Sequence, residues 1–425
     1  MHEHGDATTD AALATWVPAG DPDFPIQNLP YGAIVRDGET APHLAVAIGD
    51  YALDLGVLAR AGIFDALGSD ARALLGGSSL DVLIARERAM WRSVRSTISA
   101  YLRADTSTRN GELAARALVL RRDARNVLPF TVGAYVDFYS SLEHATNLGR
   151  ILRPGDEPLL PNWRWLPIGY HGRASTISCD SSVRRPHGQI ARASGVPEFA
   201  ATRKLDYELE LACITGNGIA GPITAERARE SVFGVALLCD WSARDMQAWE
   251  YRPLGPFLSK SFATTLGPWI VSIDALEPFR RASRAQDPPP LPHLAVEPRG
   301  AFDIVASISL RSGAMSSRGE ESDRVAEVNA GGLYWTIGQQ LAHVASNGTT
   351  LRAGDVYASG TISELDPQNS GSLIERTCDG TVPLRLSDGT TRTYLEDGDE
   401  VTLAAHARDP HAVAIGFGSL CARVI

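Results

Sequence analysis

The chain has 425 residues, of which 44% are hydrophobic and 21% are charged, the composition of a globular protein long enough for two domains. Its formal net charge of −10 argues against nucleic acid as a partner, because a phosphate backbone requires a basic surface. The sequence contains no run of about 18 apolar residues and begins with the polar stretch MHEHGDATTD, so we expect neither a membrane span nor a secretion signal.

The N-terminal part predicts a small β domain that includes one long helix. Residues 1–15 are expected to form a disordered tail, and the domain is expected to span residues 16–125. Short apolar runs between turn signals predict hairpin strands in YGAIVRDG (31–38) and HLAVAIGDYALDL (43–55). Over residues 79–102, apolar residues recur at helical spacing, which predicts a single amphipathic helix.

Residues 126–425 predict a second, β-rich catalytic domain with few helices, so the expected fold class is mainly β (α+β). The near-continuous apolar run FGVALLCDW (233–241) predicts a strand buried on both faces. The segment GLYWTIGQQLAHVAS (332–346) predicts a helix, and PLRLSDGTTRTYL (383–395) predicts a hairpin. The polar segment 314–330 is expected to form a loop.

The five cysteines are scattered singly along the chain, without a C-x-x-C pair, and their number is odd. In a chain of this length, such a pattern argues against a disulfide framework. Together with the polar N-terminus, it favours a cytoplasmic location.

The stretch KLDYELELAC places three acids, Asp206, Glu208 and Glu210, on one face of an expected strand. Such a face is either solvated, as charged faces often are, or it holds a cation. Two other acids favour the cation, because Asp240 closes a buried strand and Asp137 lies among aromatic and hydroxyl side chains. Oxygen ligands of this kind suit Mg²⁺ or Ca²⁺ rather than zinc.

His144 lies seven residues after Asp137, in a stretch that reads as a loop. A lone histidine is more often structural than catalytic. If Asp137 binds a metal, however, His144 is placed to act as a general base toward water. A carboxylate partner would then orient its ring and stabilise the imidazolium.

The segment DWSARDMQAWEYRPLGPFLSKSFATT (240–265) predicts a shaped loop, because prolines and a glycine interrupt it. It contains Arg244, Gln247 and Lys260, three donors suited to a developing oxyanion. The alternative is a packed aromatic loop with solvated charges. Further along the chain, ASGTIS (358–363) predicts a turn of small residues whose backbone N–H groups can donate hydrogen bonds to a carboxylate.

In order and spacing, these stretches resemble the fumarylacetoacetate hydrolase family. The resemblance extends from about residue 16 to the C-terminus, through the motifs DFPIQNLPYG, DFYSSLEHATN, LLPNW, LPIGYHGRAS, ELELA, DWSARDMQAWEY, PLGPFLSKSF and ASGTISELDP. It implies an N-terminal SH3-like β-barrel, a C-terminal mixed β-roll and a homodimer.

The resemblance also implies roles for individual residues. The metal ligands would be Asp137, Glu208, Glu210 and Asp240, and the residues near a second cation position would be Lys260 and Thr264. His144 would be the base and Glu375 its orienting acid, and the oxyanion donors would be Arg244, Gln247 and Lys260. The substrate-binding set would be Tyr139, Arg153, Tyr170, Gln247, Tyr251 and Thr361. Asp206 is not among these ligands and is expected to be solvated or structural.

The implied activity is hydrolysis of the carbon–carbon bond of 4-fumarylacetoacetate, a dicarboxylate diketone, to fumarate and acetoacetate, the last step of tyrosine and phenylalanine catabolism. The implied cofactor is Mg²⁺ or Ca²⁺, and oxygen ligands also admit Mn²⁺. The alternative within enzymes is acylpyruvate hydrolysis, keto-acid decarboxylation or tautomerisation at the same metal site. A calcium-stabilised binding protein with an inactive site is the alternative from another class. The presence of His144 together with Glu375, Arg244 and Lys260 argues against it.

Overall fold

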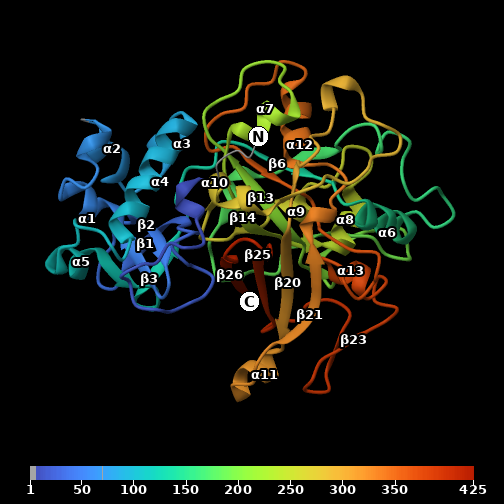
Figure 1. Ribbon diagram of the computed structural model, residues 1–425. Coiled ribbons are helices and arrows are strands. Elements are labelled where there is room, and N and C mark those ends of the chain that lie inside the picture. Colours follow the sequence, from blue (N-terminus) through green and yellow to red (C-terminus); the bar gives the residue numbers. More distant parts are fainter. Residues whose placement is uncertain (1–5, 69) are drawn as a thin grey trace.

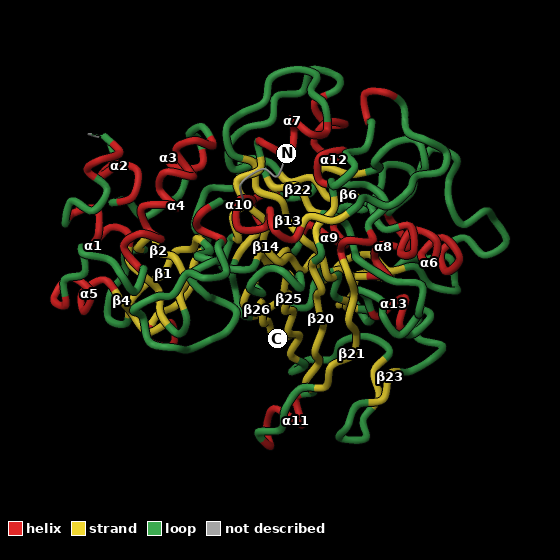
Figure 2. The backbone as a smooth tube through the Cα atoms, viewed as in Figure 1, coloured by secondary structure: helices red, strands yellow, loops and turns green. Residues whose placement is uncertain are grey.

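The structure, a computed structural model, describes residues 6–68 and 70–425. Figure 1 shows two units, a smaller one in blue and cyan built from the first part of the chain and a larger one in green to red. In the larger unit the strands gather in the middle, and helices such as α6 (Leu142–Leu152) and α12 (Ile337–Ala345) lie around them (Figure 2). The architecture is therefore mixed α/β.

The smaller unit contains a five-stranded antiparallel sheet in which both predicted hairpins are confirmed. The order across this sheet is β4 (Leu118–Leu120), β3 (Tyr51–Asp54), β2 (His43–Ile48), β1 (Tyr31–Arg36) and β5 (Ala124–Val127). In the described residues the outer strands β4 and β5 share no ladder. An SH3-like barrel therefore stays a prediction.

Part of the expected N-terminal tail is ordered. Residues 1–5 lie outside the described residues, but Ala7–Thr9 forms a 3-10 turn, η1, that is capped by Asp6. The buried hydroxyl of Thr8 accepts a hydrogen bond of 2.8 Å from Nε of the buried Arg95. The expectation of disorder is wrong for the described part of this tail, because the segment satisfies the Nε–H of a buried guanidinium whose Nη groups donate to the carbonyls of Asn28 and Gln27.

The expected single helix is two helices, α3 (Asp81–Ile84) and α4 (Arg88–Leu102), separated at an extended Glu87. In an unbroken helix, the carbonyl of Leu83 would accept the N–H four residues later. Here it accepts the backbone N–H of Arg86 at 3.0 Å and the indole N–H of Trp91 at 2.9 Å instead. The prediction of one helix is therefore wrong, because a buried tryptophan competes for the backbone acceptor at the break.

The stretch after α4 is a short loop over residues 104–110, followed by regular elements. Helix α5 (Gly111–Ala117) leads into β4, and β5 crosses the expected boundary at residue 125. Because β5 pairs with β1, we propose the domain boundary after Val127.

The polar segment 314–330 is also structured, so the prediction of a loop there is wrong. It contributes most of α11 (Gly313–Arg318) and the whole of β21 (Asp323–Asn329). Two small apolar residues of β21, Ala326 and Val328, are buried, and this alternation holds the strand in its sheet despite the polar composition.

The larger unit is built on an eight-stranded mixed sheet that carries the candidate site. Its order is β7 (Gly169–His171), β6 (Tyr135–Phe138), β22 (Val356–Ala358), β13 (Leu209–Thr215), β14 (Val232–Asp240), β16 (Thr264–Leu266) and β8 (Ile177–Ser178), with β17 (Val271–Ser272) paired to β14. The pairs β6–β22 and β8–β16 are parallel, and the others are antiparallel. All residues of β14 are buried, which confirms the predicted central strand.

A second sheet of five strands packs against the first. Its order is β21, β20 (Ile304–Arg311), β25 (Glu400–Ala407), β26 (Ile415–Val424) and β9 (Ser182–Val183). Strand β14 contacts β25 and β26, and one apolar cluster joins residues of both sheets, such as Leu237, Leu403 and Phe417. The main core therefore lies between the two sheets.

Short elements complete the larger unit. The two-stranded pairs are β10 (His187–Ile190) with β11 (Glu198–Ala201), β12 (Leu205–Asp206) with β15 (Ser242–Ala243), β18 (Arg280–Arg281) with β19 (Ala301–Phe302), and β23 (Leu384–Arg385) with β24 (Thr391–Arg392). The last pair confirms the predicted hairpin. Helix α12 confirms the other helix prediction, although it begins only after the N-cap Thr336, which forms a capping box with Gln339.

The remaining helices are short. They are α1 (Leu55–Arg60), α2 (Ala71–Leu75), α7 (Ala225–Glu230), α8 (Arg244–Glu250), α9 (Leu258–Ser261), α10 (Ile273–Leu276) and α13 (Leu373–Arg376). Within residues 6–68 and 70–425, no helix combines the length and the apolar character needed to traverse a bilayer.

An ion-pair cluster joins the two units. On α4, Nη2 of Arg88 and Nε of Arg92 lie 2.7 and 3.0 Å from the same carboxylate oxygen of Asp274 on α10. Tyr31 of β1 also forms an isolated bridge with Ile270. These contacts tie the smaller unit to the strand β14 side of the larger sheet, since α10 contacts β14.

Candidate active site

Four buried carboxylates converge in the larger unit. They belong to Asp137, Glu208, Glu210 and Asp240, and one oxygen of each lies within 4.8 Å of the others. None of the four residues is more than 4% exposed. The structure therefore brings together the four predicted metal ligands from three separate stretches of chain.

Three strands of the eight-stranded sheet, β6, β13 and β14, position these acids, and β22 lies between β6 and β13. Asp137 lies on β6, Glu210 on β13 and Asp240 at the end of β14, while Glu208 directly precedes β13. The backbone N–H of Asp240 donates to the carbonyl of Glu208 at 3.1 Å, which fixes the two strand ends together. The carboxylates are thus held by sheet pairing and not by flexible loops.

The predicted acidic strand is interrupted between Asp206 and Glu208, where β12 ends before β13 begins. The break separates the carboxylate of Asp206 from the cluster. This carboxylate accepts hydrogen bonds from the backbone N–H groups of Leu373 and Ile374 at 2.7 and 3.0 Å. Asp206 is fully buried, so the expectation that it is solvated is wrong, and its structural alternative fits these contacts.

The crowding of carboxylates opposes their ionisation. Burial, together with the charge of Asp240, raises the pKa of Asp137 well above its usual range. Burial and the charge of Asp137 do the same to the pKa of Glu210. Burial also raises the pKa of Asp240, although Lys260 acts in the opposite direction. A cation placed among these groups would favour their ionised forms.

Glu208 behaves differently because two cationic side chains contact it. Burial alone would raise its pKa, but Arg244 and Lys260 outweigh this effect and lower the pKa to about 2. The ammonium of Lys260 donates to Glu208 and, at 2.6 Å, to Asp240. Two positive charges face four carboxylates, so the cluster keeps a negative charge when all four are ionised.

The donor set fits a divalent cation. Two carboxylate oxygens of the cluster, Oδ1 of Asp137 and Oε1 of Glu210, are buried without a hydrogen-bond partner among the described residues. Leaving such atoms unpaired is costly unless a ligand satisfies them. Because all the candidate ligands are oxygens, the site suits hard cations such as Mg²⁺ or Ca²⁺.

The raised pKa values predict how stability depends on pH in the metal-free protein. A carboxyl with a raised pKa stabilises the fold at low pH and loses this contribution as the pH rises through the folded-state value. In EDTA, Asp137→Asn should therefore melt a few degrees above wild type at alkaline pH, and this gap should close as the pH falls toward the ordinary pKa of a carboxyl group. Scanning calorimetry measures the difference. A gap that is absent or that widens as the pH falls would contradict this prediction.

His144 pairs with Glu375, as the resemblance implied. The Nδ1 atom of His144 lies 2.7 Å from Oε2 of Glu375, and both residues are buried. Burial alone would raise the pKa of Glu375, but the adjacent His144 lowers it. With Nδ1–H held by the carboxylate, Nε2 is the nitrogen that can accept a proton. His144 lies in the first turn of α6, so the expectation of a loop at this position is wrong.

Three side chains that the sequence did not indicate hold Glu375 in place. The hydroxyls of Ser363 and Ser372 donate to its Oε2 at 2.9 and 2.7 Å, and the Asn147 amide donates to Oε1 at 3.1 Å. Asn147 lies three residues after His144 on α6, and this helical spacing is the only signal that could have revealed it.

The guanidinium of Arg244 connects several predicted residues. Its Nε donates to Asp206 at 2.8 Å and its Nη1 to Oε1 of Gln247 at 3.0 Å. Its Nη2 lies 2.7 Å from Oε1 of Glu208, but the N–H groups are not aligned for a hydrogen bond. These N–H groups, and the amide N–H groups of Gln247, remain for an incoming anion.

A small cavity of about 190 Å³ reaches Asp240. Three other predicted residues line it, namely Tyr170, Lys260 and Thr264. The hydroxyls of Tyr170 and Thr264 donate to Asp240 at 3.1 and 3.2 Å. Tyr135 also lines this cavity and was missed, although it shares a strand face with Asp137 two residues later.

The other predicted substrate-binding residues do not line this cavity. The ring of Tyr139 packs edge-on against His144 with centroids 5.3 Å apart. Arg153 has a buried Nε, and Thr361 a buried Oγ1, without partners in the described residues. Tyr251, half-buried at the end of α8, contacts Arg252, and no contact joins it to the carboxylate cluster in the described residues.

The small-residue turn at 358–363 does receive a carboxylate. The backbone N–H of Gly360 donates to Oε2 of Glu210 at 3.2 Å. Gly360 has a positive φ of 75°, and a Cβ there would lie 2.1 Å from the carbonyl oxygen of Phe138. Glycine is therefore required for the turn to approach the cluster.

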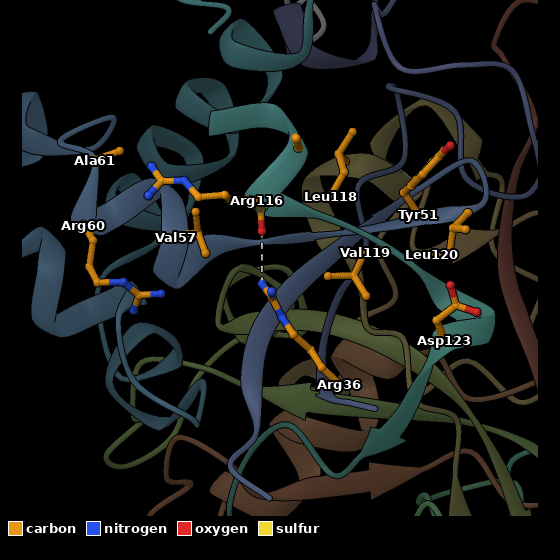
Figure 3. A pocket seen from close by; sticks show the side chains of 11 residues that line it. Arg36, Tyr51, Val57, Arg60, Ala61, Arg116, Leu118, Val119, Leu120 and Asp123 are labelled. Atoms are coloured by element: carbon orange, nitrogen blue, oxygen red, sulfur yellow. Dashed lines mark hydrogen bonds between the residues drawn. The ribbon is translucent and has the colours of Figure 1, made fainter. Parts of the chain in front are cut away.

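A larger cavity of about 780 Å³ lies in the smaller unit and contains none of the predicted site residues. Figure 3 shows its side chains, with Arg36 donating to the backbone carbonyl of Arg116 at 3.3 Å. Cavity size alone would point here, but the carboxylate cluster and the His144–Glu375 pair lie in the larger unit.

Comparisons with known proteins identify the family of the chain. Residues 27–129 match the family described as fumarylacetoacetase N-terminal, and residues 133–425 match the fumarylacetoacetate hydrolase C-terminal family. Curated proteins named fumarylacetoacetase are similar over nearly the whole chain. The relative from Rattus norvegicus is 42% identical, and the match covers 96% of this chain and 97% of the relative. The relative from Arabidopsis thaliana is 42% identical, and the match covers 98% of this chain and 99% of the relative.

The fold is shared with a solved structure from Mycobacterium smegmatis that is described as an HpcE protein. It is 20% identical, covers 92% of this chain and 98% of that chain, and has a TM-score of 0.52. This likeness concerns the fold alone, whereas the sequence relatives and the two family matches concern ancestry. The chain belongs to the fumarylacetoacetate hydrolase family.

Proposed function

We propose that the protein uses a divalent cation to hydrolyse the carbon–carbon bond of 4-fumarylacetoacetate, which yields fumarate and acetoacetate. This reaction is the last step of tyrosine and phenylalanine catabolism. One observation carries the proposal: four buried carboxylates meet beside a buried His144–Glu375 pair. Glu208 forms an isolated bridge with Ser372, whose hydroxyl donates to Glu375, so the pair lies next to the cluster. Curated relatives named fumarylacetoacetase, which match over nearly the whole of both chains, support the substrate.

The cation would be held by Asp137, Glu208, Glu210 and Asp240, with Mg²⁺ or Ca²⁺ as the proposed ion and Mn²⁺ also accepted. The proposed second cation position lies near Lys260 and Thr264. When bound, the cation would polarise the diketone oxygens and offset negative charge on the departing group, as a Lewis acid.

His144 is the proposed base. Its Nε2 accepts a proton from water, and the water oxygen bonds to the carbonyl carbon. Glu375 keeps Nδ1 protonated and stabilises the imidazolium that forms. The carbon–carbon bond then breaks, its electron pair leaves on the acetoacetate fragment as an enolate, and the proton on His144 returns to that carbon.

Arg244, Gln247 and Lys260 are the proposed donors to the tetrahedral oxyanion. Because Oε1 of Gln247 already accepts Arg244, the amide N–H groups are what Gln247 offers. The proposed substrate-binding residues are Tyr139, Arg153, Tyr170, Gln247, Tyr251 and Thr361. Among them, Arg153 has a buried Nε without a partner in the described residues, which suits a substrate carboxylate.

The proposal is tested by following the loss of diketone absorbance when the protein is added to fumarylacetoacetate. We expect turnover that EDTA abolishes and that Mg²⁺ or Ca²⁺ restores. Acylpyruvates serve as comparison substrates. Turnover of an acylpyruvate but not of fumarylacetoacetate would show that the protein catalyses a different reaction. Turnover that persists in EDTA would show that the reaction needs no cation.

Gln247→Met should lower kcat by about 10²-fold, because it keeps the length of the side chain but removes an oxyanion donor. The loss is measured by steady-state kinetics with saturating cation. Gln27→Met is the control, since Gln27 is a buried glutamine that donates to backbone carbonyls in the smaller unit, away from the proposed site. Equal kcat values for the two variants would exclude Gln247 from the oxyanion role.

We also propose a homodimer and a cytoplasmic location. The dimer is implied by the family and is checked by sedimentation. The location is supported by the five cysteines, none of which forms a disulfide.

A further inference from the structure

Asp206 is a buried carboxylate without a role in the chemistry proposed above. It is fully buried, and it lies outside the group of four carboxylates. Its two oxygens accept three hydrogen bonds, from Leu373 N–H, Ile374 N–H and Nε of Arg244. Each of these donors belongs to an element that carries proposed site residues.

The first two bonds fix helix α13. Leu373 and Ile374 are the first two residues of this helix, and their N–H groups have no partner within it. The cap residue, Ser372, does not satisfy them, because its hydroxyl donates to Glu375. Asp206 therefore caps α13 from a distant part of the chain. Glu375, the third residue of this short helix, is placed by that cap.

The third bond fixes the guanidinium of Arg244. With Nε on Asp206 and Nη1 on Gln247, the plane of the guanidinium is set, and Nη2 is directed to the side of Glu208. The negative charge of Asp206 also attracts Arg244. Without this charge, the guanidinium would be attracted to Glu208 alone.

We infer that Asp206 is a positioning residue that sets the His144–Glu375 pair in register with Arg244 and Gln247. The inference rests on the proposed function. Hydrolysis requires the base to reach water while the donors reach the carbonyl oxygen, and a misplacement of about 1 Å can cost about 10² in rate. The carboxylate of Asp206 accepts hydrogen bonds from both α13 and Arg244, so it fixes their relative position directly.

The alternative is that Asp206 only stabilises the fold, and a matched variant separates the two roles. Asp54 is also fully buried, caps a short helix through the N–H of Val57, and forms an ion pair with Arg36. It lies in the smaller unit, away from the proposed site. Asp206→Asn and Asp54→Asn should therefore lose comparable stability, while only the first should change the site.

Two measurements decide the question. In steady-state assays with saturating cation, corrected for the folded fraction, Asp206→Asn should lower kcat by about 10²-fold and leave KM nearly unchanged. In calorimetric titration of the metal-free proteins with Ca²⁺, it should weaken binding by roughly tenfold, because Arg244 then competes more strongly for Glu208. Asp54→Asn should match wild type in both.

A double-mutant cycle tests whether Asp206 acts through Glu375. In a Glu375→Gln background, Asp206→Asn should cost clearly less than it does alone, because the pair it aligns is already lost. If Asp206→Asn does not fold, Asp206→Glu replaces it, since the longer carboxylate keeps the charge but must displace α13 or Arg244. A loss of kcat is then again expected, and wild-type kcat overturns the inference.

The inference and the proposed function can fail separately. If wild type does not hydrolyse fumarylacetoacetate, the proposed function fails, and the Ca²⁺ titration still decides the inference. If wild type is active but Asp206→Asn equals it in both kcat and Ca²⁺ affinity, the inference is overturned while the function stands.

Discussion

His144→Ala is expected to lower kcat by about 10³- to 10⁴-fold while the protein still binds its cation. The imidazole is the proposed base, and its Nδ1 is already held by Glu375 at 2.7 Å. Removing it leaves the carboxylate cluster intact, because His144 is not one of its members. Steady-state kinetics measure the rate, and calorimetric titration with Ca²⁺ or Mg²⁺ measures the binding.

The control for this variant is His406→Ala. The Nε2 atom of His406 lies 2.7 Å from Oδ1 of Asp23, so it forms a histidine–carboxylate pair of the same length elsewhere in the structure. We expect this control to keep its activity. Wild-type turnover in His144→Ala would remove His144 from the role of base, and loss of cation binding would show that its effect passes through the cluster.

Glu210→Ala is expected to lose both cation binding and activity. Glu210 is fully buried between the other acids of the cluster, and its Oε1 has no other partner among the described residues. Changes in residues that only support metal ligands cost about 10- to 100-fold in affinity, so loss of a ligand should cost at least about 10²-fold. Activity at sub-saturating cation should fall in parallel.

Glu297→Ala provides the comparison for Glu210→Ala. Glu297 is another buried glutamate, but it pairs with Arg229 and Arg280 and lies outside the cluster. This variant should lose stability without losing affinity for the cation once folded. Stoichiometric binding of Mg²⁺ or Ca²⁺ by Glu210→Ala at wild-type affinity would show that the ligand assignment is wrong.

The sequence was most informative where a local pattern determines structure. Alternating and continuous apolar runs predicted the hairpins and the buried strand β14, because side chains on strands alternate with a period of two. The acids Glu208 and Glu210 were found for the same reason. The carboxylate convergence itself depends on the pairing order of β6, β13 and β14, which no local pattern contains.

The errors arose where distant residues compete for backbone groups. The break between α3 and α4 depends on the Trp91 indole taking a carbonyl of the preceding turn. The burial of Asp206 depends on a helix that begins more than 160 residues later, where it accepts two N–H groups. Such contacts leave no periodic signal in the sequence, so their partners could be identified only from the folded chain.

The order in which the site assembles follows from the strands that carry it. Asp137, Glu210 and Asp240 become neighbours only after segments distant in sequence have paired within one sheet. Such non-local contacts form late and slowly in folding. A cation should therefore find no complete binding site until the folding barrier is crossed. Its binding would then lower the unfolding rate without raising the folding rate.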